Sequence, residues 1–137
     1  SMIKKRLLLS LLTIVLFQNF FLSSCSKKQT SSQETSKPKV ANSASIPTYV
    51  FYFASWCGFC HRMAPSVKKA ALEFNKKVYF YYVDIDSEEG KTFSSKYRPD
   101  GNGVPYAQYY DKEGNFISDK IGLITYEDLK SSLEKLL

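Results

Sequence analysis

The chain has 137 residues, of which 44% are hydrophobic and 15% aromatic, so one domain with a sizeable core is expected and disorder over the whole length is excluded. The formal net charge is +6, from 19 basic and 13 acidic residues. Three cysteines are too few for a disulfide scaffold, and a single histidine argues against a metal cluster with several ligands.

The first segment has the pattern of a secretory signal. Ser1 is interpreted as a remnant of a cloning junction, and three basic residues precede an apolar run over residues 7–22. The sequence Leu-Ser-Ser-Cys that ends at Cys25 resembles the bacterial lipobox, whose cysteine is acylated and becomes the first residue of the mature protein. We therefore predict a signal peptide over residues 1–24 and a lipid on Cys25. An ordinary signal peptide and a retained membrane anchor remain as alternatives.

Residues 25–45 are predicted to form a lipidated, flexible tether. Apart from Val40 the segment has no large apolar side chain, so it cannot bury enough surface to offset its ordering entropy. A flexible chain of about 20 residues has a root-mean-square reach of roughly 25 Å.

The positive charge lies outside residues 46–137. The signal segment carries +3 and the tether another +3, from Lys4, Lys5 and Arg6 in the first and from Lys27, Lys28, Lys37 and Lys39 against Glu34 in the second. Residues 46–137 contain 12 basic and 12 acidic residues. A neutral domain gives no support to a nucleic-acid partner.

Residues 46–137 alternate between strand and helix patterns. The uncharged aromatic run from Thr48 to Ala54 predicts a buried strand. Apolar residues at helical spacing between Cys60 and Asn75 then predict an amphipathic helix.

The second half of this region continues the alternation. The apolar run 78–85 predicts a central parallel strand, and Ser87 is a suitable cap for a short helix. Residues 107–110 and 116–121 flank a turn and predict a hairpin, and Thr125 opens a last helix. Phe93 and Tyr97 are expected on one face of the short helix, and Leu129, Leu133 and Leu136 are expected to face inward on the last helix. The predicted order is β-α-β-α-β-β-α, in the α/β class.

Two cysteines lie where the first strand ends and the helix begins. Unpaired backbone N–H groups and the helix dipole stabilise negative charge there, so Cys57 is expected to be partly thiolate and nucleophilic. Two intervening residues bring Cys60 close enough to form a disulfide, so Cys60 can resolve a mixed disulfide on Cys57. We expect Cys60 to be the more buried of the two.

The motif Trp56-Cys57-Gly58-Phe59-Cys60, after an aromatic strand, resembles the active site of the thioredoxin family. Pro65 matches the family's helix-kinking proline, and Gly103-Val104-Pro105 resembles its cis-proline loop. The resemblance implies a thioredoxin-like fold with a central mixed four-stranded sheet flanked by helices. It also implies thiol-disulfide exchange through a redox-active Cys57–Cys60 disulfide, with no other cofactor and no metal. Val104–Pro105 is then cis, and the backbone near Val104 pairs with an extended substrate segment.

The sequence departs from the family at several positions. Phe51 stands where thioredoxin has a buried aspartate, and Tyr82 stands at the position of its usual lysine partner. Tyr106 replaces the common threonine after the cis-proline, and the stretch 98–103 is slightly longer than usual. Thioredoxin's proton handling and its substrate specificity therefore do not transfer.

The motif has other interpretations. Cys57 to His61 also spells the Cys-X-X-Cys-His attachment site of c-type haem, but no second axial ligand accompanies His61. The same residues supply only three zinc ligands from one turn. His61 is expected either to support the thiolate in its protonated form or to be solvated without a role.

These observations predict a lipid-anchored, extracytoplasmic thiol-disulfide oxidoreductase on a bacterial membrane. Its substrates are protein thiols and disulfides, and its reduction needs a membrane electron-transfer partner. Because no basic residue lies between the cysteines, the reductase direction is favoured. A disulfide-forming oxidase and a redox-inert adaptor of the same fold are the alternatives.

Overall fold

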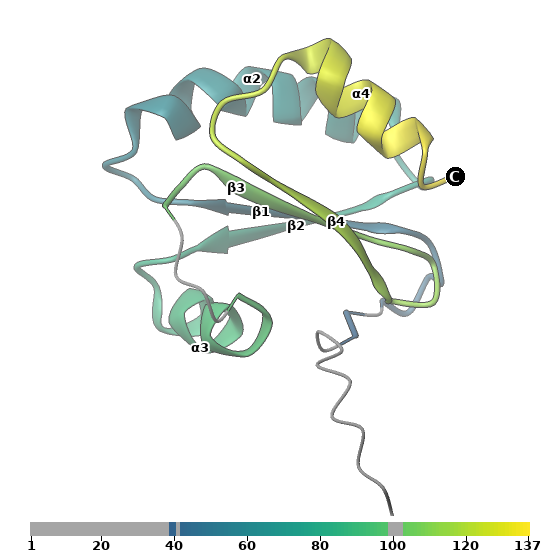
Figure 1. Cartoon of the computed structure of the whole chain (residues 1–137), viewed down its shortest axis with the longest axis horizontal. Coiled ribbons are helices and arrows are strands. Elements are labelled where there is room, and N and C mark those ends of the chain that lie inside the picture. The colour runs from purple at the N-terminus through teal and green to yellow at the C-terminus, as the bar shows by residue number, and fades with distance from the viewer. Residues whose placement is uncertain (1–38, 41, 99–102) are drawn as a thin grey trace, which may run out of the picture. The chain divides into compact units, whose positions relative to one another are not determined.

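Four strands form a mixed sheet in the computed structural model, which describes residues 39–40, 42–98 and 103–137 (Figure 1). The predicted signal segment 1–24 and the predicted lipidation residue Cys25 lie outside the described residues. The elements are β1 (Thr48–Phe53), α2 (Gly58–Glu73), β2 (Tyr79–Asp84), α3 (Glu88–Tyr97), β3 (Tyr106–Tyr110), β4 (Phe116–Ile121) and α4 (Tyr126–Glu134). The predicted order β-α-β-α-β-β-α is confirmed.

The strand order β2-β1-β3-β4 brings three loops to one end of the sheet. β1 runs parallel to β2 and antiparallel to β3, and β3 is antiparallel to β4. The carboxyl ends of β1 and β2 therefore meet the start of β3. The cysteine motif, the β2–α3 loop and the Val104–Pro105 segment come together at this end.

Each face of the sheet has its own core. Side chains alternate along β1, so Tyr49 and Phe51 pack in the cluster that includes α2 and α4, whereas Val50 and Tyr52 pack in the cluster with α3. Figure 1 shows α2 and α4 on one face and α3 on the other. The predicted inward positions of the last helix are confirmed, because Leu129 and Leu133 are fully buried and Leu136 packs against them.

The prediction that residues 78–85 form a central strand is wrong. β2 is parallel to β1 as expected, but it lies at the edge of the described sheet. Its apolar character reflects helices on its two faces, which a sequence pattern cannot distinguish from strands on its two sides. The rings of Tyr79 and Tyr82 mark the edge, at 44% and 49% exposure.

The predicted caps of the later helices are confirmed. The hydroxyl of Ser87 accepts a hydrogen bond from Gly90 N, and that of Thr125 accepts one from Asp128 N. Gly90 is needed where α3 meets the end of β2, because a Cβ there would lie 1.7 Å from the carbonyl oxygen of Asp84. On α3, the rings of Phe93 and Tyr97 lie side by side, as the sequence predicts.

Contacts with the domain begin within the segment assigned to the tether. Val40 N donates to the carbonyl of Gly114, and the Asn42 side chain donates to Ile46 O and to the Thr48 hydroxyl. Among the described residues, no helix combines the length and the apolar character needed to cross a membrane.

Candidate active site

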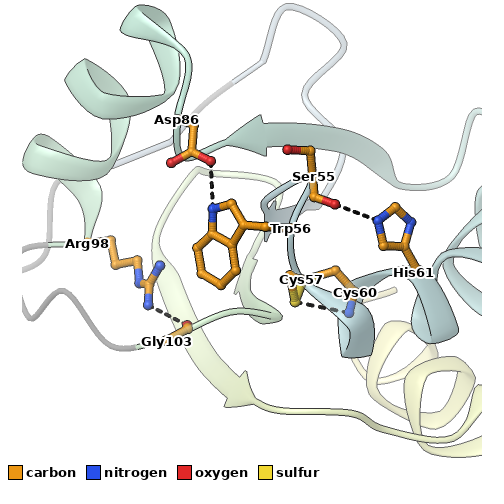
Figure 2. The surroundings of a disulfide bond; sticks show 8 residues. All are labelled: Ser55, Trp56, Cys57, Cys60, His61, Asp86, Arg98 and Gly103. Atoms are coloured by element: carbon orange, nitrogen blue, oxygen red, sulfur yellow. Dashed lines mark hydrogen bonds between the residues drawn. A yellow bond between two sulfur atoms is a disulfide. The ribbon is translucent and has the colours of Figure 1, made fainter.

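Cys57 occupies the N-cap of α2. Its own backbone N–H donates to Ala54 O at 3.1 Å, which turns the chain from β1 into the helix. Its sulfur accepts a hydrogen bond from Cys60 N at 3.1 Å (Figure 2). The sulfur therefore lies where helix N–H groups stabilise negative charge, as the sequence predicts.

Cys57 and Cys60 are joined in a disulfide. Their Cα atoms are 5.2 Å apart, within the usual range for such a bond. Both residues are 4% exposed, so the prediction that Cys60 is the more buried is wrong for the disulfide form. Val104, from the loop before β3, packs against the cluster that the two cysteines form with Ala54, as do Phe53 and Ile85.

Two aromatic side chains of the motif are exposed beside the disulfide. Trp56 is 68% exposed, and its Nε1–H donates to Asp86 Oδ2 at 2.8 Å (Figure 2). Phe59 is 54% exposed, with the Arg62 guanidinium 4.5 Å from its ring centre. Trp56 and Phe59 therefore form a partly apolar surface beside the disulfide.

Gly58, between these two side chains, has free space around it. A Cβ built there would meet no atom within 4 Å. The packing of this turn therefore does not by itself require glycine.

The side chain of His61 binds the loop before the helix. Its Nε2 is 2.7 Å from Ser55 O, and because a carbonyl only accepts, this nitrogen carries the hydrogen (Figure 2). Further along α2, Pro65 lies inside the helix and is exposed. Proline lacks an N–H, so it interrupts the helical hydrogen bonds there, as the resemblance implies.

The expected cis peptide bond at Val104–Pro105 is present. The proline is buried, and its carbonyl oxygen accepts a hydrogen bond from Gly122 N at 2.8 Å. This bond ties the cis-proline loop to the end of β4. The loop thus lies against the disulfide through Val104 and against β4 through Pro105.

A buried polar network lies under this loop, on the α3 face of the sheet. The Gln108 side chain accepts hydrogen bonds from the hydroxyls of Tyr52 at 2.7 Å and Tyr110 at 3.0 Å, and it donates to Tyr97 O at 2.9 Å. Tyr106, next to the cis-proline, donates its hydroxyl hydrogen to Asp119 Oδ2 at 2.7 Å. Burial and this bond raise the pKa of Tyr106 to about 12.

Arg98 joins the network from the C-cap of α3. The guanidinium donates from Nη2 to Gly103 O at 2.6 Å (Figure 2). Its Cζ lies 4.5 Å from the ring centre of Tyr106 and 5.4 Å from that of Tyr52. Burial lowers the pKa of Arg98, and both tyrosines oppose that change.

A cavity of about 550 Å³ opens beside Cys60, between α2, β1 and β2. Phe51 and Phe53 form its apolar wall, and Lys68 and Tyr82 also line it. Phe51 is buried here, so an aromatic ring fills the position where the resemblance places an aspartate in thioredoxin. Burial raises the pKa of Tyr82.

The structure adds residues that sequence reasoning missed. Asp86 and Gly122 contact Trp56 and Pro105, yet neither stands within a recognisable motif. The polar position of Asp86 after a strand end was the only local signal for it. For Arg98, the sequence indicates only that it begins a long loop.

The described residues contain no group of three or more side chains suited to hold a metal ion. The two sulfurs that a c-type haem would need are bonded to each other, and the His61 ring binds Ser55 O.

Sheet topology and the position of the disulfide together define the class of thioredoxin-like proteins. The family model described as Thioredoxin matches residues 27–135, and the chain belongs to the thioredoxin family.

Proteins with similar sequences or structures are named as thioredoxins, thioredoxin-like proteins or thiol:disulfide interchange proteins. The chain is 27% identical to the thioredoxin-like protein HCF164 of Arabidopsis thaliana, over 66% of this chain and 34% of that protein. It is 32% identical to a thiol:disulfide interchange protein TxlA homolog of Synechocystis, over 56% of this chain and 41% of that protein. Thioredoxin O2 of Arabidopsis thaliana, solved in the oxidised state, matches with a TM-score of 0.58 and 28% identity, over 70% of this chain and 79% of that one. The chain thus spans less than half the length of HCF164 and of the TxlA homolog.

Proposed function

We propose that this protein is a lipid-anchored thiol-disulfide oxidoreductase that reduces disulfides of other proteins outside the cytoplasm. The observation that carries the activity is the Cys57–Cys60 pair at the start of α2, with the Cys57 sulfur accepting the N–H of Cys60. The names of the relatives support the same reaction class.

The reduced protein acts in two exchange steps. The Cys57 thiolate attacks one sulfur of a substrate disulfide, forms a mixed disulfide and releases the other substrate sulfur as a thiolate, which takes a proton. Cys60, once deprotonated, attacks the Cys57 sulfur, releases the second substrate thiol and closes the Cys57–Cys60 disulfide. Two electrons pass to the substrate, so a dithiol partner at the membrane must reduce the pair again.

The proton of Cys60 leaves through the neighbouring cavity in this scheme. Phe51 supplies no carboxylate there, and Tyr82, whose pKa is raised, keeps its proton at neutral pH. Water and the ring of His61, which also lines the cavity, are then the candidate acceptors.

The reductase direction is supported by the residues between the cysteines. Gly58 and Phe59 carry no charge that would stabilise the reduced pair as a thiolate. A pair whose reduced form lacks such added stabilisation is the weaker oxidant.

Reduction of insulin by dithiothreitol, with the full chain as catalyst, tests the activity. We expect catalysis by the native chain, none by the Cys57→Ser variant, and a trapped mixed disulfide with the Cys60→Ser variant. The equilibrium potential of the pair against glutathione tests the direction: roughly −270 mV supports a reductant, and roughly −120 mV an oxidant. If no Cys57–Cys60 disulfide forms in this titration, the adaptor alternative replaces the exchange activity.

Expression in a bacterium tests the anchor. We expect the native chain in the membrane fraction with a lipid on Cys25, and the Cys25→Ala variant without lipid. A native chain that carries no lipid would exclude the anchor and leave the exchange activity standing.

A further inference from the structure

Arg98 holds both sides of the cis-proline. Its Nη2 donates to the carbonyl oxygen of Gly103 at 2.6 Å, two residues before Pro105. Its Cζ lies 4.5 Å from the ring centre of Tyr106, the residue directly after Pro105. One guanidinium therefore fixes the backbone before the cis bond and a side chain after it.

Burial of the Arg98 side chain costs free energy because the side chain is charged. The residue is 7% exposed, and its Nε has no hydrogen-bond partner among the described residues. Burial of a partly satisfied charge is costly, and an apolar side chain of similar length would fill the space without that cost. The charge-assisted bond to Gly103 and the contacts with Tyr106 and Tyr52 are what the guanidinium adds.

The loop that Arg98 holds is the one that meets the disulfide. Val104 packs against the cluster that contains Cys57 and Cys60, and Pro105 O accepts a hydrogen bond from Gly122 N. Within the described part of the chain, the backbone groups of Val104 make no backbone hydrogen bond. They remain available to an extended segment that adds alongside the loop.

We propose that Arg98 is a positioning residue for protein substrates, which fixes Gly103 and Tyr106 so that Val104 presents its backbone to an extended peptide next to the disulfide. The proposal rests on the proposed function, since it concerns how the substrates of that function dock. Arg98 touches neither sulfur, so its effect is confined to substrates that carry further residues on both sides of their cysteine.

The test compares a peptide with a small molecule that undergoes the same chemistry. The full chain carries Cys25→Ser and Cys60→Ser, so that Cys57 is its one thiol. One substrate is a ten-residue peptide whose central cysteine is a mixed disulfide with 2-nitro-5-thiobenzoate, and the other is the same activated cysteine as an N-acetyl amide. In both, Cys57 attacks the cysteine sulfur and expels coloured thiobenzoate, so the ratio of the two rates measures backbone docking.

We expect the peptide to react faster than the amide with the native Arg98, and Arg98→Met to lower the ratio about tenfold through loss of a charge-assisted hydrogen bond. The amide rate and the circular dichroism spectrum should stay as in the parent. Arg98→Lys keeps the charge without the planar fork and should recover part of the ratio. If Arg98→Met does not fold, the Arg98→Lys variant provides the comparison with the parent. Lys96→Met, an exposed cation in the last turn of α3, is the matched control and should leave the ratio unchanged.

Each other result overturns the proposal. A ratio of one in the parent means that the loop docks no backbone, and an unchanged ratio in Arg98→Met means that Arg98 does not position it. Equal losses for peptide and amide would assign Arg98 a structural role only. Failure of the proposed function is seen separately, in the insulin assay.

Discussion

The two faces of the sheet are built from different chemistry. Towards α2 and α4 the core is aliphatic and aromatic, with Met63, Val67, Leu129 and Leu133 packed on the strands. Towards α3 the buried layer holds a glutamine bonded to tyrosine hydroxyls, with an arginine over their rings. The buried polar side chains of the second face are held by direction-dependent bonds.

The two kinds of core contribute differently to the stability of the fold and to the positions of its atoms. Apolar packing has no preferred direction and tolerates small shifts, whereas hydrogen bonds fix atoms to within a few tenths of an ångström. The polar face lies under the cis-proline loop, and Tyr106 and Arg98 belong to both. We therefore expect the apolar face to contribute mainly to the free energy of unfolding and the polar face also to the geometry of the site.

Truncation on the apolar face should have the largest effect on stability. Leu129→Ala removes a fully buried side chain and is expected to lower the free energy of unfolding by about 3 kcal/mol. Urea unfolding followed by circular dichroism measures it, with Leu137→Ala, at a position 65% exposed, as the control. Equal effects of the two changes would contradict the assignment of this face as the core.

Loss of the glutamine on the polar face should have a smaller effect. Gln108→Leu leaves the hydroxyls of Tyr52 and Tyr110 without their acceptor and is expected to cost about 2 kcal/mol. Tyr110→Phe removes one bond of the same network and should cost about 1 kcal/mol. If Gln108→Leu unfolds at the same urea concentration as the native chain, the network makes no net contribution.

The smallest expected difference between the two faces is at alkaline pH, where both should lose stability in the same pH range. Burial raises the pKa of Tyr109, on the apolar face, and of Tyr106, on the polar face, to about 12. The pKa of an unfolded tyrosine is about 10, so this stabilisation is complete below about pH 10 and is lost as the pH rises towards 12. Urea midpoints from pH 9 to 12 should fall over that window, and less steeply in Tyr106→Phe and Tyr109→Phe. A midpoint that stays level to pH 12 would contradict the raised values.

Local signals in the sequence were sufficient for most elements and for the cysteine pair. The uncharged run at β1, the Ser87 cap and the position of Cys57 at a helix start each depend on neighbouring residues, and the structure has them as predicted. The edge position of β2 depends on which strand pairs with which, and no pattern within residues 78–85 records that.

The missed parts of the site depend on contacts between distant elements. The cluster that buries Cys57 and Cys60 includes Ile85 and Val104, which lie more than 20 and more than 40 residues later in the chain. The role of Arg98 requires α3 to end beside the start of β3, which follows from the packing of α3 on the sheet. The contacts of side chains in such positions can be recognised only once the fold is known.

The single tryptophan of the chain gives the redox pair a built-in optical reporter. Trp56 directly precedes Cys57, and the bond to Asp86 holds its indole in one orientation. A disulfide near an indole quenches its fluorescence more strongly than a dithiol does, so we expect emission to rise when the pair is reduced. A docked protein that covers this exposed ring would instead shift the emission to shorter wavelength. Redox change and substrate binding can thus be followed separately in the unlabelled protein.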